Sequence, residues 1–258
     1  MSRTAIITGG AGGLGRALDT GLRARGWTTV LVDLPGPALA ALPALPDRLV
    51  LAGDLTDAAA IRDICNQVRT ARPSIDLVIY NAGITQIGGF GVTPLEAHRA
   101  VFAINYFATV EMAKELLADI RAAQGTHLAI SSVAGFSPLF HRTAYAASKH
   151  ALEGFFASLR AEEKDFGVDC LIAAPSFVAT NPGNPDLRPG GIARPGSATD
   201  GIDYMPPEQA AGIILKGLER RQAFIPVGRV ARMAYLLNRL SPALFARMME
   251  RSIKRGDR

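Results

Sequence analysis

The chain has 258 residues, 48% of them hydrophobic and 20% charged, an ordinary composition for a globular protein with enough length to bury one sizeable core. The net charge of +5 is uneven, because residues 216–258 hold 11 Lys/Arg and 3 acids, a net of +8, which leaves −3 for the first 215 residues. This asymmetry argues against a nucleic-acid-binding protein built on a basic domain and indicates a basic tail on a nearly neutral body.

The first predicted elements are a strand at residues 5–8, a glycine-rich turn at 9–15 and a helix at 16–25. Two overlapping motifs fit the turn, G-x-G-x-x-G beginning at Gly10 and T-G-x-x-x-G-x-G beginning at Thr8. Glycines permit close backbone approach, and the start of a helix offers unpaired N–H groups to a diphosphate. A strand, a glycine-rich turn and a helix in this order predict a dinucleotide-binding site.

The second predicted strand, residues 28–34, closes on Asp33, eighteen residues beyond Gly15. An acid at this strand end is placed to bind the adenosine ribose 2′-hydroxyl and to repel a 2′-phosphate. Since no Lys or Arg stands beside Asp33 or inside the glycine turn, we expect NAD rather than NADP. The alternative is that Asp33 only caps a turn.

Strands and helices alternate along the rest of the chain. After a Pro/Ala/Leu-rich segment at 35–46, strands are predicted at 48–52, 75–80, 126–132, 168–174 and 223–227, and helices at 57–69 (capped by Thr56), 94–123, 144–164 and 207–221. This α/β pattern predicts a single Rossmann-like doubly wound domain, residues 1–227, with a seven-stranded, mostly parallel sheet in the order 3-2-1-4-5-6-7 and helices on both faces. Ligands then bind at the carboxyl ends of the strands.

Two segments fall outside the regular alternation. Residues 176–205 contain four prolines and five glycines with little periodicity, and we expect a substrate lid there. Residues 228–258 form a basic amphipathic C-terminal helical extension that Pro242 interrupts. Such a segment is suited to an anionic membrane surface; the alternative is that it folds over the pocket or forms a subunit contact.

Tyr145 and Lys149 lie four residues apart on the predicted helix, so their side chains share one face. A cation beside a phenol favours the phenolate and moves its pKa toward the neutral range, where it serves as an acid or base. The spacing alone is common. It gains weight because the glycine turn, Asp33 and Ser132 are all expected at the same strand ends.

These residues resemble the short-chain dehydrogenase/reductase family, in its short single-domain branch, over roughly residues 3–227. The matching pieces are Thr8-Gly9-x-x-x-Gly13-x-Gly15, Asp54, Asn81-Ala82-Gly83, Asn105, Ser132, Tyr145-x-x-x-Lys149, Pro175 and Thr180. One departure is Ser176, where the family usually has glycine, and a side chain there is expected to crowd the pocket or touch substrate.

The resemblance implies a role for each catalytic candidate. Tyr145 is the acid/base, Ser132 hydrogen-bonds the substrate oxygen, Lys149 binds the nicotinamide ribose and lowers the Tyr145 pKa, and Asn105 holds a water of a proton relay. The implied cofactor-binding residues are Gly9, Gly13, Leu14, Gly15, Asp33, Leu34, Asp54, Leu55, Asn81, Ala82, Gly83, Tyr145, Lys149, Pro175, Val178 and Thr180.

The expected substrate-binding residues are mostly apolar: Ile84, Ser132, Phe136, His141, Ser176 and Phe177. No Lys or Arg is placed among them unless Arg188 or Arg194 of the lid turns inward. We therefore expect an NAD-dependent alcohol dehydrogenase or ketone reductase acting on CH–OH groups of a lipophilic or uncharged substrate. The alternatives are a catalytically silent NAD-binding scaffold or regulator, and a membrane-surface-associated reductase of a lipid-like substrate.

The remaining expectations concern surroundings and partners. Cys65 and Cys170 lie far apart without metal spacing, which favours a reduced, cytoplasmic protein. The four histidines show no ligand spacing, so no metal is expected. The N-terminus runs directly into an apolar strand, and no apolar run reaches the roughly 18 residues of a membrane span, so neither a leader peptide nor a span is expected. The resemblance also implies a homodimer or homotetramer formed through the helices at about 96–122 and 144–164.

Overall fold

A computed structural model describes residues 3–181, 186–196 and 204–256, with side chains through residue 249. Within these ranges the predicted lid, residues 176–205, is described only in part, and the last side chains of the C-terminal extension lie outside.

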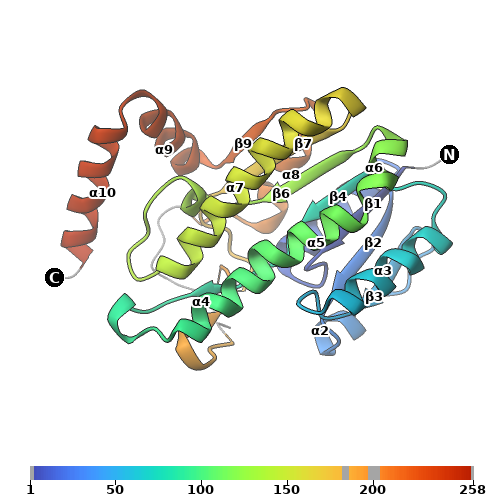
Figure 1. Cartoon of the computed structure of the whole chain (residues 1–258), viewed down its shortest axis with the longest axis horizontal. Coiled ribbons are helices and arrows are strands. Elements are labelled where there is room, and N and C mark those ends of the chain that lie inside the picture. Colours follow the sequence, from blue (N-terminus) through green and yellow to red (C-terminus); the bar gives the residue numbers. More distant parts are fainter. Residues whose placement is uncertain (1–2, 182–185, 197–203, 257–258) are drawn as a thin grey trace.

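A seven-stranded sheet forms the centre of the molecule (Figure 1). Its strands run in the order β3-β2-β1-β4-β6-β7-β9, and every neighbouring pair is parallel. Their bounds are β1 Thr4–Thr8, β2 Thr28–Asp33, β3 Arg48–Ala52, β4 Leu77–Tyr80, β6 Thr126–Ile130, β7 Asp169–Pro175 and β9 Phe224–Val227. The short strands β5 and β8 form a separate sheet. When only the seven strands of the main sheet are numbered along the chain, their order is the predicted 3-2-1-4-5-6-7.

Helices cover both faces of the sheet. One face carries α3 (Ala58–Ala71), α5 (Ala108–Glu115) and α7 (Thr143–Glu163), and the other carries α1 (Gly13–Arg23) and α8 (Pro207–Glu219). Successive strand residues divide between two buried clusters, as Ile6 and Ile7 do in β1. Both faces are therefore apolar, which explains why these strands are continuous hydrophobic runs.

The helix predicted at residues 94–123 is broken into pieces. The structure has α4 (Leu95–Phe102), a π-helical turn (Ala103–Phe107), α5, and then α6 (Leu117–Ala123). Side-chain periodicity alone does not reveal an extra residue in a helical turn.

The predicted cap of α3 is one residue out. The Asp57 side chain accepts a hydrogen bond from the backbone N–H of Ala59, so Asp57 caps α3. Thr56 instead donates its N–H and hydroxyl to Oδ1 of Asp54, both at 2.8 Å. Asp and Thr are both good capping residues, and the turn that Asp54 forms decides between them.

A two-stranded antiparallel sheet joins the lid to the segment after β4. In it β5 (Thr85–Gln86) pairs with β8 (Ile192–Ala193), and the backbone N–H of Ile87 donates to the carbonyl of Gly191 at 2.8 Å. Strands of two residues carry no sequence pattern, so this connection was not predicted.

Two helices follow β9, namely α9 (Arg229–Leu240) and α10 (Pro242–Gly256), with the break at Pro242 as expected. In Figure 1 they form a hairpin at the edge of the molecule. Among the described residues, every helix is too short or too polar to cross a bilayer.

Candidate active site

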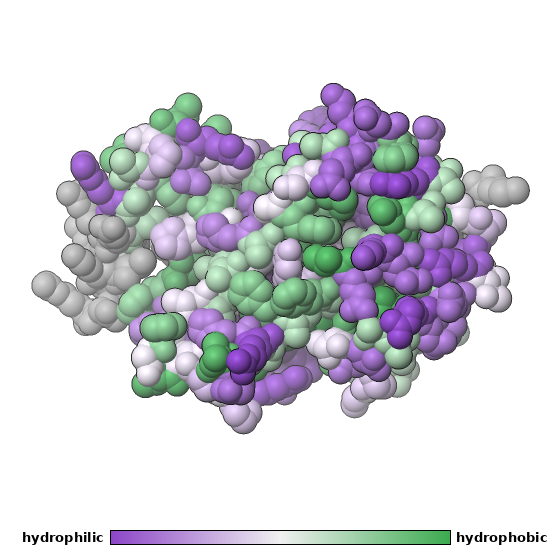
Figure 2. All heavy atoms as spheres, in the orientation of Figure 1, coloured by the Kyte–Doolittle hydropathy of each residue, from purple (hydrophilic) through white to green (hydrophobic). Residues whose placement is uncertain are grey.

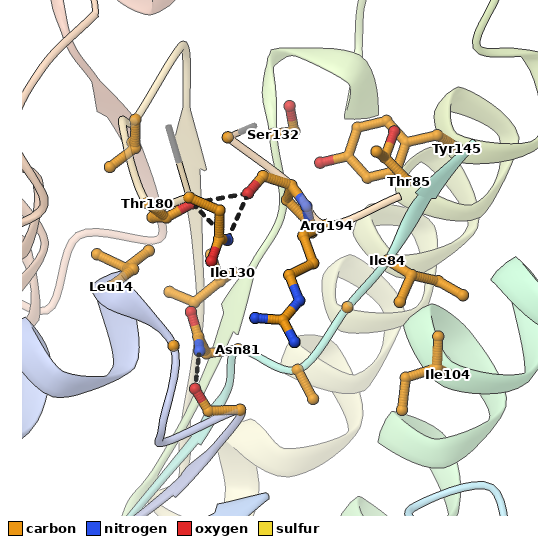
Figure 3. A pocket seen from close by; sticks show the side chains of 18 of the residues that line it. Leu14, Asn81, Ile84, Thr85, Ile104, Ile130, Ser132, Tyr145, Thr180 and Arg194 are labelled. Atoms are coloured by element: carbon orange, nitrogen blue, oxygen red, sulfur yellow. Dashed lines mark hydrogen bonds between the residues drawn. The ribbon is translucent and has the colours of Figure 1, made fainter. Parts of the chain in front are cut away.

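A cavity of about 1610 Å³ opens at the carboxyl ends of the central strands. Its lining includes all sixteen predicted cofactor residues and Ser132. Figure 3 shows how side chains far apart in the sequence, from Leu14 to Arg194, converge on it. Within the described ranges no group of His, Cys, Asp or Glu side chains is arranged to hold a metal ion.

The glycine-rich turn forms one end of this cavity. Gly9 has a φ of +65°, which favours glycine, and a Cβ on Gly15 would overlap the Gly9 carbonyl oxygen. A Cβ on Gly13 would lie 2.8 Å from the carbonyl oxygen of Thr180, so the segment after β7 packs directly on the start of α1. Side chains at these glycine positions would clash with the neighbouring backbone. The turn is therefore a bare backbone loop, and the first N–H groups of α1 lie at the cavity.

Polar groups hold the neighbouring strand ends in place. Asp33 accepts hydrogen bonds from the backbone N–H of Ala11 at 2.9 Å and of Leu34 at 2.8 Å, so its carboxylate lies against the glycine turn. Asn81 donates its side-chain amide to the carbonyls of Thr8 at 3.0 Å and Gly9 at 3.1 Å. Arg16 also lines this end of the cavity, and its side chain is exposed. This cation was not among the predicted cofactor-binding residues.

Ser132, Tyr145 and Lys149 lie together at the other end. The Ser132 hydroxyl lies near Tyr145, whose pKa it lowers, and accepts the backbone N–H of Ala134 at 3.2 Å. Lys149 is 5% exposed, and its Nζ lies 5.9 Å from the centre of the Tyr145 ring. In contrast, Ser131, on the opposite side of the strand, donates its hydroxyl to Oε1 of Glu153 at 2.7 Å.

The pKa values of these groups are set mainly by burial. Burial lowers the pKa of Lys149 from 10.5 to about 8, and its Nζ donates to the carbonyl of Ile130 at 2.8 Å. Burial also raises the pKa of Tyr145, and this outweighs the lowering by Ser132 and by the nearby Arg142. The expected lowering of the Tyr145 pKa by Lys149 is therefore not seen in the chain by itself, because the ammonium is directed at a backbone carbonyl.

Asn105 lies in the π-helical turn behind the cavity and is 1% exposed. Its Oδ1 accepts the N–H of Ile84 at 2.9 Å, and its Nδ2 donates to the carbonyl of Ile84 at 3.0 Å and to Ser148 Oγ at 2.9 Å. The side chain thus ties the end of β4 to α7, and it does not line the cavity itself. The relay water predicted for Asn105 stays a prediction.

Four of the six expected substrate-binding residues line the cavity, and two do not. Ile84, Ser132, Ser176 and Phe177 line the cavity. Phe136 was wrongly predicted to do so: its ring packs against Phe224 and Tyr235, beside a second cavity of about 490 Å³. Val133–Gly135 forms a 3-10 turn, which carries Phe136 away from the main cavity.

His141 was also wrongly placed in the pocket. It has a φ of +55°, is exposed, and stacks on Phe140 with a ring separation of 3.6 Å, while Phe140 itself lines the cavity. Because α7 begins only at Thr143, His141 lies outside the helix that carries Tyr145.

Ser176 is accommodated where the family usually has glycine. Its hydroxyl donates to the carbonyl of Val227 at 3.4 Å and lies beside Gly228, where a Cβ would come within 2.8 Å of it. A glycine at 228, with φ of +102°, therefore leaves the space that the serine fills.

Three arginines also line the cavity, namely Arg142, Arg188 and Arg194. Figure 3 shows the Arg194 side chain extending into the cavity, with Asn81 and Ile84 nearby. The sequence left an inward-turned lid arginine open as an alternative, and only the fold of the lid shows that this occurs.

A model of the family described as short chain dehydrogenase matches residues 3–187. The chain belongs to the short-chain dehydrogenase/reductase family. Among curated proteins it resembles dehydrogenase/reductase SDR family member 7B of Xenopus laevis, with 32% identity over an alignment of 209 residues that covers 78% of this chain. That match spans 63% of the relative, just under two thirds of its length.

Solved structures agree on the fold. A short-chain dehydrogenase from Burkholderia cenocepacia in complex with NADP gives a TM-score of 0.83 at 21% identity, covering 96% of this chain and 98% of that one. A short-chain dehydrogenase/reductase from Burkholderia phymatum in complex with NAD gives 0.77 at 20% identity, covering 93% and 95%. At these identities the likeness concerns the architecture, which extends over nearly the whole length of the chain.

Proposed function

We propose that this protein transfers a hydride between NAD and a secondary alcohol or ketone. The observation that carries the proposal is one cavity with a glycine cradle and Asp33 at one end and Tyr145, Ser132 and Lys149 at the other. The glycine turn has no side chains that would keep a ligand away from its backbone, and N–H groups at the start of α1 face the cavity there. These features fit the diphosphate of a dinucleotide. When bound, the nicotinamide supplies the hydride acceptor or donor.

The residues of the chain perform the proton chemistry. In alcohol oxidation the substrate oxygen lies between Ser132 and Tyr145, and the phenolate oxygen of Tyr145 takes the hydroxyl proton as hydride leaves the carbinol carbon. In ketone reduction the Tyr145 hydroxyl returns that proton to the oxygen. A pKa of about 8 leaves Lys149 mostly protonated near neutral pH, so it places a buried positive charge 5.9 Å from the centre of the Tyr145 ring, although in the chain by itself this charge does not lower the Tyr145 pKa.

NAD is proposed over NADP because of Asp33. Its carboxylate is held against the glycine turn by two backbone N–H groups, where a ribose 2′-phosphate would meet a negative charge. One of the two structural neighbours cited above is a complex with NADP and the other with NAD, so the likeness does not distinguish between the two cofactors. The preference for NAD therefore rests on Asp33.

The substrate is proposed to be lipophilic around its reacting carbon. Ile84, Ile104, Leu139, Phe140 and Phe177 all line the cavity, and the arginines of the lining come from α1, from the predicted lid and from the residue before α7. Apolar walls with a few placed polar groups are typical of sites for small apolar molecules.

Tyr145→Phe tests the mechanism. The ring and its packing are kept while the proton carrier is removed, so we expect turnover of alcohols with NAD to fall by at least about 10³-fold. NADH binding, followed by fluorescence, should remain within a few-fold of wild type. A variant with near-normal turnover would rule the mechanism out, and a wild type that binds NADH without turning over any alcohol or ketone would favour the silent scaffold.

A surface on the C-terminal hairpin supports the membrane alternative as a second proposal. On α9 the exposed side chains Met233, Leu236 and Leu240 are 73%, 58% and 83% accessible. Arginines at 229, 232, 239 and 247 accompany them, and residues 229–249 contain no acid. Val230, Ala234 and Met249 of the same hairpin line the cavity. An apolar ridge with cations is the pattern of helices that lie on anionic lipid, and here it adjoins the opening through which a lipid-like substrate would pass.

Vesicle flotation tests this proposal. Leu236→Asp with Leu240→Asp should abolish binding to vesicles containing anionic lipid, whereas Val92→Asp, at an equally exposed apolar residue outside the hairpin, should not. Flotation that is equal for both variants and for wild type would contradict membrane contact and leave the hairpin as a pocket cover or subunit contact.

A homo-oligomer is also proposed. Figure 2 shows apolar side chains gathered along the middle of the face that α5 and α7 form, and Phe107, at the start of α5, is 60% exposed. Light scattering of Phe107→Glu should show a smaller species than wild type, and an unchanged mass would exclude this face.

The buried thiols of Cys65 and Cys170 suit a reducing, cytoplasmic setting, which remains a proposal.

A further inference from the structure

The lid is attached to the glycine turn near its Arg194. Thr180 donates its hydroxyl to the carbonyl of Pro195 at 2.7 Å, and Asn181 donates its side-chain amide to the same carbonyl at 2.9 Å. Thr180 in turn packs against Gly13 at the first turn of α1. The backbone next to Arg194 is therefore fixed close to the helix N-terminus at which a diphosphate is expected.

A second attachment holds the lid from the other side. Ala193, the neighbour of Arg194, pairs with Thr85 in the β5–β8 sheet and is 2% exposed. Arg194 thus lies between two anchored points, one on the glycine turn and one beyond the end of β4. Its side chain has a limited region of the cavity to occupy.

The Arg194 side chain extends into the space that leads from the glycine turn toward Tyr145 (Figure 3). In that view its guanidinium lies between Leu14 and Thr180 on one side and Ile84 and Ile104 on the other. Its Nε lies 3.4 Å from Asp186, and the side chain remains 46% exposed. Asp33, Tyr145 and Arg194 line the same cavity, so the guanidinium is available to a dinucleotide bound there.

The other arginines of the lining are placed differently. Arg142 lies near Tyr145, whose pKa it lowers, and so belongs to the reacting end. Arg188 donates to Asp186 at 2.8 Å and stands at 54% exposure. Arg16 is exposed on α1 itself, so it belongs to the helix side of the cavity. On the opposite side, the backbone that is fixed beside the glycine turn belongs to Arg194.

We propose that Arg194 binds the diphosphate of the dinucleotide from the lid side, opposite the N-terminus of α1. A diphosphate carries two negative charges, and the helix terminus offers only about half a positive charge, so a guanidinium fork supplies most of the compensation. Asp186 is one partner of Arg194 in the chain by itself, and the diphosphate would compete with that solvent-exposed ion pair. The lid is thereby held over the cofactor by the cofactor's own charge.

This inference rests on the proposed function, and equilibrium binding tests it apart from activity. The probes are NADH and ADP-ribose, which share the diphosphate while only NADH carries a nicotinamide. Arg194→Gln is expected to weaken both by about tenfold or more, and Arg194→Lys by less, since a point charge remains without the fork. The loss should shrink as salt is raised. Arg99→Gln, at an exposed residue of α4 outside the cavity, is the control.

The outcomes separate the two claims. If wild type binds neither probe, the nicotinamide function itself is wrong. If wild type binds both and Arg194→Gln binds them equally well, the inference about Arg194 is overturned while the proposed function stands. A rise in the substrate KM alone, with both dissociation constants unchanged, would assign Arg194 to an anionic substrate group and would also overturn it.

Discussion

Replacing Lys149 by methionine makes the cost of its burial measurable. In the folded chain the ammonium is 5% exposed, and burial brings its pKa from 10.5 to about 8. Below pH 8 both the folded and unfolded chains carry this proton. As pH rises from about 8 toward 10.5, the folded chain releases it first, so the unfolded chain binds more protons and the free energy of unfolding increases.

The size of the effect follows from the same two values. Each pKa unit corresponds to about 1.4 kcal/mol, so the complete effect is about 3 kcal/mol, of which about 2 kcal/mol develops between about pH 7 and pH 9.5. The absolute stability of Lys149→Met is less informative. Relief of the buried charge opposes the loss of the donor to the Ile130 carbonyl, and a lost donor costs about 1–3 kcal/mol.

The assay is urea unfolding of the cofactor-free protein at both pH values, followed by fluorescence of Trp27, the single tryptophan, which is buried in the core against α1 and α8. Wild type should gain about 2 kcal/mol relative to Lys149→Met as the pH rises. For the control Lys164→Met, at an exposed lysine just after α7, the free energy of unfolding should change with pH as it does for wild type. Parallel profiles for wild type and Lys149→Met would refute the reasoning.

Two further substitutions probe the ends of the cavity. Asp33→Ser removes the charge that faces the ribose, and we expect the ratio of kcat/KM for NAD to that for NADP to fall by about tenfold or more; an unchanged ratio would mean that Asp33 only caps its turn. Glu153→Leu leaves the Ser131 hydroxyl without its buried acceptor and should lower the free energy of unfolding by about 1–3 kcal/mol, while Glu153→Gln, which keeps an acceptor, should lower it less. Equal losses in the two Glu153 variants would contradict the hydrogen-bond argument.

The sheet and the polar groups at its edge were predictable because they follow from local patterns. Hydrophobic runs that alternate with helices fix a parallel sheet, and parallel strands bring Asp33, Asn81 and Ser132 to one edge whatever the loops do. The spacing of Tyr145 and Lys149 is likewise a property of one helix. These predictions required no knowledge of how distant segments pack.

The errors lie where packing between distant segments decides. Phe136 follows a 3-10 turn and joins an aromatic group with Phe224 and Tyr235, a contact made by residues about ninety positions further on. Arg194 enters the cavity because a two-residue strand pairs with Thr85–Gln86. Interactions of this kind leave no periodic trace in the sequence, so they become visible only in three dimensions.

The π-helical turn at Ala103–Phe107 has a consequence for the two surfaces of its helix. One residue more per turn shifts the phase of all that follows by about 100° relative to an uninterrupted α-helix. Asn105, within this turn, faces inward and ties Ile84 to α7, while Phe107, two residues later, is 60% exposed. A single inserted position thus turns the side chains of α5 to a different side of the helix from the one that the periodicity of α4 would give them.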